Sequence, residues 1–180
     1  VRGDPGLGKS QLAHAIACFL DWGLIPTVIH YNSNIEDLLY SQDHLERLYH
    51  ANQTKLDGVN DTTAKLAPEK YIRPGKIWQA IAPSTLSDYC GDKPHDKQGY
   101  VLLIDEIDKA DSSLPNALLE VLDSKTIRVP CLKEPIKQDT EHSLFVVITS
   151  NDERLLPQAF LRRCAVLDLR LESEEEKAIE

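Results

Sequence analysis

The stretch Gly3-Asp4-Pro5-Gly6-Leu7-Gly8-Lys9-Ser10 decides the fold, because it spells G-x-x-x-x-G-K-S near the start of this 180-residue chain. In this pattern the glycines allow a tight turn that points consecutive backbone N–H groups at phosphate oxygens. Lys9 adds a positive charge for the β- and γ-phosphates, and the Ser10 hydroxyl is suited to ligate Mg²⁺. The stretch therefore predicts a nucleotide-binding loop, and the alternative is a plain glycine-rich turn.

A helix is expected directly after this loop. Residues 11–20 carry apolar side chains at helical spacing, namely Leu12, Ala15, Ile16, Phe19 and Leu20. The partial positive charge at the start of such a helix would lie beneath bound phosphates.

Further along the chain, strand patterns alternate with helix patterns. Residues 100–104 and 144–149 are apolar on both faces, which is typical of buried strands in a parallel sheet. A short strand is expected at 26–31 and an edge strand with one wet face at 165–171. Helices are expected at 35–51 (as one helix or two), 69–81 (starting after Pro74-Gly75), 110–123 and 156–163. The alternation predicts an α/β fold with a parallel sheet, helices on both faces and the ligand at the carboxyl ends of the strands.

Three segments break this alternation. Residues 51–68 are polar and indicate a loop or a small insertion, and residues 88–99 are typical of a mobile surface loop. Residues 126–129, together with those around Ile136, favour a β-hairpin before the strand at 144–149.

Two adjacent acids close the most apolar strand. Asp105 is suited to hold Mg²⁺, directly or through water. Glu106, on the other side of the backbone, is suited to orient and deprotonate an attacking water. The alternative is a solvated turn after a strand, which the upstream phosphate loop disfavours.

Polar residues also follow the next strand and the short helix after it. Asn151 could bridge a γ-phosphate and a water, or it could be a turn residue or a helix N-cap. Arg162 and Arg163 end the helix predicted at 156–163. They could complement the C-terminus of that helix, or they could reach the nucleotide of a neighbouring subunit.

Composition excludes several classes of protein. The net charge of −9 gives no general electrostatic reason to bind nucleic acid. No apolar run reaches the length of a membrane span, and no signal-peptide pattern opens the chain. The four cysteines form no C-x-x-C pair and the six histidines show no metal-ligand spacing, which favours free thiols in a reducing cytoplasm. The chain has no methionine and only two residues before Gly3, so we expect a fragment whose first strand is truncated.

These motifs, in this order, resemble those of the AAA+ ATPases, a branch of the P-loop NTPases. Within that family the chain looks most like the MoxR-like group, through residues 103–110, 114–120 and 156–164. The resemblance implies that Lys9 and Ser10 belong to Walker A and that Asp105 and Glu106 form Walker B. It also implies that Asn151 is sensor 1 and that Arg163 is the arginine finger, with Arg162 as the less certain neighbour.

The same resemblance implies how the domain is organised and what it does. The ATPase core would span residues 1–172, with an insertion at about 51–99 and a hairpin at about 126–140. Residues 173–180 would begin a helical lid that is otherwise missing, so the lid arginine, sensor 2, has no assignment. The expected protein is a ring, most simply a hexamer, that hydrolyses ATP with Mg²⁺ and remodels protein clients, without a membrane and without nucleic acid.

Two other functions remain open at this point. A relative of these motors could act on nucleic acid if other domains supplied a basic surface. A nucleotide-gated scaffold could bind ATP and change conformation with little turnover, although the intact Asp105-Glu106 pair argues against this.

Overall fold

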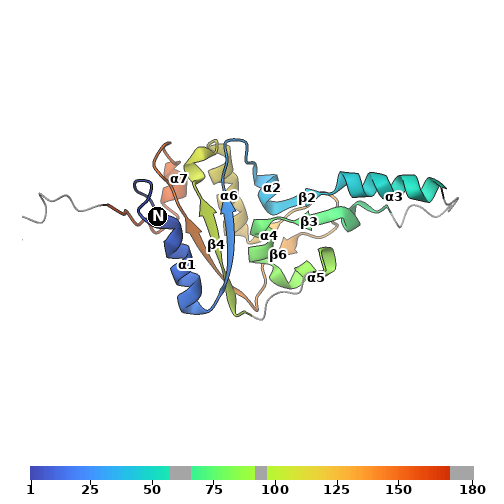
Figure 1. The fold of residues 1–180 in the computed structure, drawn as a ribbon, viewed down its shortest axis with the longest axis horizontal. Coiled ribbons are helices and arrows are strands. Elements are labelled where there is room, and N and C mark those ends of the chain that lie inside the picture. The colour runs from blue at the N-terminus through green and yellow to red at the C-terminus, as the bar shows by residue number, and fades with distance from the viewer. Residues whose placement is uncertain (57–65, 92–96, 171–180) are drawn as a thin grey trace, which may run out of the picture.

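A parallel sheet of three strands lies at the centre of the computed structural model, which describes residues 1–56, 66–91 and 97–170 (Figure 1). Its strands are β1 (Gly23–Val28), β4 (Gly99–Asp105) and β7 (Ser143–Ile148), in the order β1-β4-β7. The larger helices are α1 (Lys9–Leu20), α3 (His44–Leu56) and α6 (Ser113–Ser124). The shorter elements are α2 (Ile35–Leu39), β2 (Tyr40–Gln42), η1 (Pro68–Tyr71), β3 (Ile72–Pro74), α4 (Lys76–Ile81), η2 (Pro83–Thr85), α5 (Leu86–Tyr89), η3 (Ile107–Lys109), β5 (Thr126–Ile127), β6 (Ile136–Lys137) and α7 (Gln158–Leu161).

The central strand β4 is buried on both faces, as its apolar sequence predicts. Val101 and Leu103 pack with Ala13 and other residues of α1 on one face. Leu102 and Ile104 belong to a larger cluster on the other face, which includes residues of α4 and α6. Successive side chains of a strand point to opposite faces, so both layers of helices are held by this one strand. The predicted α/β architecture, with helices on both faces of a parallel sheet, is confirmed.

The register of the sheet brings the carboxyl ends of its strands together. Val28 pairs with Asp105, and Ile104 pairs with Ile148, so the carboxyl ends of all three strands meet at one edge. At the same edge the Val1 amino group donates to the Ile148 carbonyl at 2.7 Å, and the Ser150 N–H donates to the Val1 carbonyl at 3.0 Å. The glycine-rich loop therefore starts at the edge where the acid pair ends β4.

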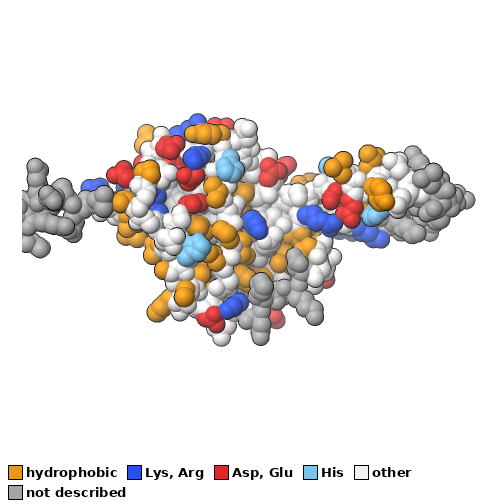
Figure 2. Space-filling model, viewed as in Figure 1, with side chains coloured by type: hydrophobic (Ala, Val, Ile, Leu, Met, Phe, Trp, Pro, Cys, Tyr) orange, Lys and Arg blue, Asp and Glu red, His pale blue; other side chains and the backbone are white. Residues whose placement is uncertain are grey.

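An arm projects from the body of the molecule (Figure 1). Its base is the antiparallel pair β2–β3, in which Tyr40 pairs with Pro74, and its outer part contains α3. Apolar side chains of α3, among them Leu45 and Leu48, are exposed along this arm, and Figure 2 shows them interspersed with charged groups.

The first strand of the described sheet differs from its predicted position at 26–31. It begins at Gly23, where a Cβ atom would lie only 2.6 Å from the Tyr100 ring, and it continues through Pro26. Proline is tolerated here because β1 is an edge strand in the described sheet. The strand ends at Val28, and the chain then turns, with the Ser33 N–H bonded to the His30 carbonyl at 2.9 Å.

The edge strand predicted at 165–171 is wrong over its described residues. Only Asp168 forms a bridge, and its partner is Arg2. The backbone of Arg2 bonds the Leu167 carbonyl and the Leu169 N–H, both at 2.9 Å. A longer strand needs a longer partner, and Arg2 is followed at once by the turn of the glycine-rich loop. Strand β7 also differs from prediction, since Phe145 is 45% exposed instead of covered.

Among the helices, the predicted region 35–51 divides into α2 and α3, with β2 between them. The region predicted as a loop from 51 begins with the last turns of α3, and the helix predicted over 110–123 starts later, at Ser113. The hairpin is confirmed, but it is short: Ile127 pairs with Ile136. The predictions for 57–65, 92–96 and 171–180 lie outside the described residues, and these include the start of the lid at 173–180.

We expect Leu102→Ala to lower the free energy of unfolding by about 2–5 kcal/mol, because its side chain is fully buried in the larger cluster. Leu155→Ala is the matched control, since Leu155 is fully exposed and its loss should change stability by less than about 0.5 kcal/mol. Urea unfolding followed by circular dichroism measures both, and equal effects would contradict the assignment of β4 as the core.

Candidate nucleotide site

The glycine-rich loop folds around its own lysine. Gly3, Gly6 and Gly8 have φ angles of 141°, 85° and 80°, in the left-handed region that favours glycine. Lys9 begins α1 and is 6% exposed, and its ammonium group donates to the carbonyls of Gly3 at 2.6 Å and Asp4 at 2.8 Å. These bonds draw the loop into a closed turn over the start of the helix.

The start of α1 fits a polyphosphate. Among the described residues, no side chain caps this end of the helix, so its first N–H groups face the turn without a side-chain acceptor there. The first N–H groups of the helix and the adjacent lysine together supply the donors and the positive charge that phosphate oxygens require. The residues present therefore suit the nucleotide phosphates predicted for residues 3–10.

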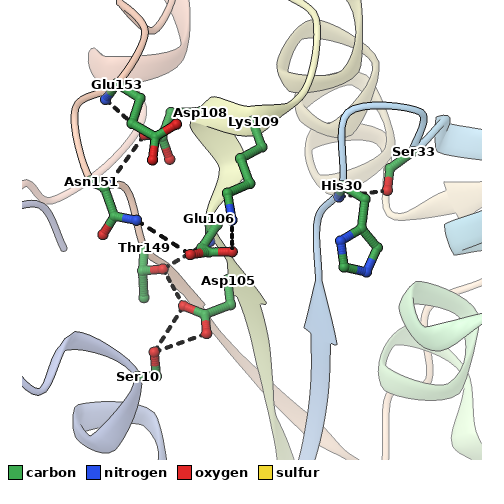
Figure 3. Close-up of polar contacts among 10 residues, drawn as sticks. All are labelled: Ser10, His30, Ser33, Asp105, Glu106, Asp108, Lys109, Thr149, Asn151 and Glu153. Atoms are coloured by element: carbon green, nitrogen blue, oxygen red, sulfur yellow. Dashed lines mark hydrogen bonds and ion pairs between the residues drawn. The ribbon is translucent and has the colours of Figure 1, made fainter. Parts of the chain in front are cut away.

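Ser10 and Asp105 come together from two elements (Figure 3). The Ser10 hydroxyl lies 2.8 and 2.9 Å from the two carboxylate oxygens of Asp105. The Thr149 hydroxyl donates to the same carboxylate from the end of β7. Hydroxyl and carboxylate oxygens are the ligands that Mg²⁺ prefers, so the predicted pair fits this ion by its chemistry.

Glu106 lies where β4 turns into η3. Its φ angle of 61° is left-handed, and its N–H donates to the Thr149 hydroxyl at 3.0 Å. One carboxylate oxygen accepts a bond from the Asn151 side chain at 3.3 Å, and the other lies 2.5 Å from the Lys109 ammonium. This hydrogen bond to Glu106 raises the pKa of Lys109 above its usual value. The lysine is therefore charged at neutral pH.

Asp108 fastens the Glu106 segment to the loop after β7. Its side chain is buried, and one oxygen accepts the backbone N–H groups of Asn151 at 3.1 Å and Glu153 at 2.9 Å. The other oxygen is buried without a hydrogen-bond partner within the described part of the chain. A buried carboxylate with two charge-assisted bonds holds the turn that carries Asn151.

The structure gathers most of the predicted residues, but not the arginines. Ser10, Asp105, Glu106 and Asn151 form one hydrogen-bonded group, linked through Thr149 and placed at the carboxyl edge of the sheet (Figure 3).

Arg163 lies at the end of α7 and contacts a different element. Its guanidinium pairs with Asp123 of α6 at 3.0 Å and donates to the Ala159 carbonyl at 3.2 Å. This second bond matches the alternative in which the arginine complements its own helix end. Arg162 is exposed. Within the described residues, neither arginine has a hydrogen bond or ion pair to the acids that close β4.

Three members of the group were not predicted as site residues: Thr149, Asp108 and Lys109. Thr149 precedes Ser150-Asn151 at a strand end, and position alone could have suggested it. Asp108 and Lys109 follow the acid pair closely, within the stretch 103–110 that carries the family resemblance. The partners of Asp108 come from the chain fold, because the 149–153 loop meets it only when β7 lies beside β4, whereas Lys109 pairs locally with Glu106, three residues earlier.

In the described ranges, no three His, Cys, Asp or Glu side chains are grouped so that they could hold a metal ion. Across the same ranges, none of the helices has the length and hydropathy needed to cross a membrane. All four cysteines are free thiols.

Comparison with known proteins agrees with this geometry. A family model described as "AAA domain (dynein-related subfamily)" matches residues 1–164. Among solved structures, 133 chains match, and one of them is the crystal structure of a candidate ATPase from Cytophaga hutchinsonii. That match has a TM-score of 0.54 and 16% identity, and it covers 99% of this chain but 43% of the other. The chain thus spans less than half of that protein, and the likeness concerns the fold. The chain matches none of the curated proteins.

We expect Asp108→Ala to lower the free energy of unfolding by roughly 2–4 kcal/mol, because a buried carboxylate would be lost and two part-buried N–H groups would lose their acceptor. Asp111→Ala removes a nearby acid that is 84% exposed and pairs with Arg154 at 3.4 Å, so it should change stability little. Thermal and urea unfolding of both variants measure the difference. If Asp108→Ala were as stable as Asp111→Ala, the buried carboxylate would not hold the Glu106 segment to the loop after β7.

Proposed function

We propose that this chain, which belongs to the AAA domain family (dynein-related subfamily), binds ATP with Mg²⁺ and hydrolyses it. The observation that carries the proposal is the meeting of the lysine-bearing loop, through Ser10, with the acid pair that closes β4. A loop that only turned the chain would not need a buried lysine beside uncapped helix N–H groups.

In this proposal the loop of residues 3–10 binds the triphosphate. Lys9 would exchange its bonds to the Gly3 and Asp4 carbonyls for bonds to β- and γ-phosphate oxygens. Ser10 and Asp105 would hold Mg²⁺, which neutralises charge on the phosphate oxygens when it is bound. Thr149 would keep the Asp105 carboxylate turned toward Ser10.

Hydrolysis would follow from Glu106 and Asn151. Glu106 accepts a proton from a water whose oxygen attacks the γ-phosphorus in line with the bond to the β–γ bridging oxygen. That bond breaks, leaving ADP and inorganic phosphate. Asn151, which already donates to Glu106, would fix the water and a γ-phosphate oxygen relative to the base.

The arginines support a ring. Arg163 is paired with Asp123 instead of with the proposed site, and both side chains are about half exposed. We infer that Arg163, with Arg162 beside it, reaches the nucleotide of the next subunit and stabilises charge in the transition state. A closed ring of identical subunits gives every site such a neighbour, and a hexamer is the simplest ring by resemblance.

We place the chain in the MoxR-like group, with a core over 1–172 and protein clients as the substrates of remodelling. The arm of β2, α3 and β3 supports the proposed insertion, although its bounds differ from 51–99. The arm starts earlier, at Tyr40, and α4, which lies within 51–99, packs into the core. Free thiols at all four cysteines support a cytoplasmic location. The net charge of −9 favours proteins over nucleic acid as clients.

Glu106→Gln should retain ATP binding and lower the turnover number at least about a hundredfold, because the amide cannot accept the proton from water. Phosphate release and calorimetric ATP binding by the complete natural protein measure the two effects. Glu141→Gln, at an exposed glutamate, serves as the control and should behave like the wild type. Wild-type turnover in Glu106→Gln would remove this residue from the mechanism.

Mixing two inactive variants tests whether the arginine acts across subunits. Arg163→Ala and Glu106→Gln should each be inactive alone, and their mixture should regain a measurable fraction of activity. A mixed ring contains interfaces where an intact Glu106 site faces an intact Arg163. Arg162→Ala in the same assay identifies which arginine is needed. A mixture as inactive as its components, although the rings exchange subunits, would argue against an arginine supplied by the neighbour.

A further inference from the structure

We propose that Lys109 is a positioning residue for the reaction, because it holds the Glu106 carboxylate in the orientation from which it accepts a proton. This inference rests on the proposed ATP hydrolysis and on the role of Glu106 in it. Neither the family match nor the solved relative assigns a role to this lysine.

The backbone of Glu106 is already fixed. Its left-handed conformation places it at the sharp turn after β4, and its N–H is bonded to the Thr149 hydroxyl at 3.0 Å. The next N–H, of Ile107, donates to the Thr149 carbonyl at 3.0 Å. With the backbone held at two points, the direction of the carboxylate depends on the side-chain torsions alone.

Two donors from two different loops hold those torsions. The Lys109 ammonium lies 2.5 Å from one carboxylate oxygen, and the Asn151 amide lies 3.3 Å from the other. The charged contact is the shorter, and charge-assisted bonds are roughly twice as strong as neutral ones. Figure 3 shows the Lys109 side chain running back along η3 to reach Glu106.

The lysine is itself well placed to do this. The 3₁₀ turn of η3, in which the Lys109 N–H donates to the Glu106 carbonyl at 3.0 Å, puts the two residues on one side of the segment. Asp108, between them in the turn, is buried and tied to the 151–153 loop. The side chains of Lys109 and Glu106 are only 25% and 29% exposed, so water screens their pairing less than it would screen a surface pair.

Without Lys109, the carboxylate would retain one neutral contact at 3.3 Å. It could then rotate away from the water, and a displaced base loses rate even when the substrate still binds. The loss should therefore appear in the turnover number and not in the affinity for ATP.

The test compares Lys109→Met with wild type in the complete natural protein with Mg²⁺ and ATP. We expect a turnover number about tenfold lower, with KM and the calorimetric Kd for ATP within twofold of wild type. Lys109→Arg should recover much of the loss, because a guanidinium also donates to a carboxylate. In a Glu106→Gln background, Lys109→Met should cause no further loss, since the group it positions is gone.

Lys97→Met is the matched control. Lys97 also pairs with an acid at 2.5 Å, but that acid is Asp21, which follows α1 and is remote in sequence from the acid pair. The loss of the Lys97 ammonium group should therefore leave the turnover number unchanged. Lys109→Gln provides a second variant in case the methionine disturbs the turn. Melting temperatures of the set separate folding from positioning.

Several results would overturn the inference. These are an unchanged turnover number in Lys109→Met and Lys109→Gln, a raised one (which would mean that Lys109 restrains the base), or a loss that Lys109→Arg does not recover. A fall in melting temperature that accounts for the loss in both variants would likewise assign Lys109 to stability alone. The proposed function fails separately, if wild type does not hydrolyse ATP or if Glu106→Gln hydrolyses it at the wild-type rate.

Discussion

The burial of β4 on both faces is the constraint on which the rest of the structure depends. Leu102 and Val101 fill opposite layers of the core, so the strand can neither shift nor turn without exposing one of them. In a strand, a shift of one residue exchanges the two faces. The carboxyl end of β4 is thereby fixed, and with it Asp105, which meets Ser10 from the helix that covers one face.

The acid pair is held by the neighbouring strand as much as by its own. Thr149 bonds both the Asp105 carboxylate and the Glu106 N–H, while Asp108 bonds two N–H groups of the loop after β7. Contacts run in both directions between these two segments, so each helps to hold the other in place. Such mutual support keeps polar side chains in place at a sheet edge where water competes for each bond.

The mispredicted elements share a physical cause. The strand predicted from residue 26 begins at Gly23, because residues 23–25 also pair with β4 and only glycine fits beside Tyr100. The region 165–171 alternates like a strand, but its described backbone pairs with Arg2 alone. In both cases the decisive partner lies far away in the chain, where local periodicity carries no information.

The sequence by itself determined the α/β class, the glycine-rich loop and the residues of the acid pair, because spacing and apolar runs encode these locally. Only the tertiary structure decided that Asn151 lies against Glu106, that Asp108 is buried, and that Arg163 pairs with Asp123. These contacts depend on which strand lies beside β4 and on how the connecting turns close. A charged residue reads the same in a sequence whether its partner is water or another side chain.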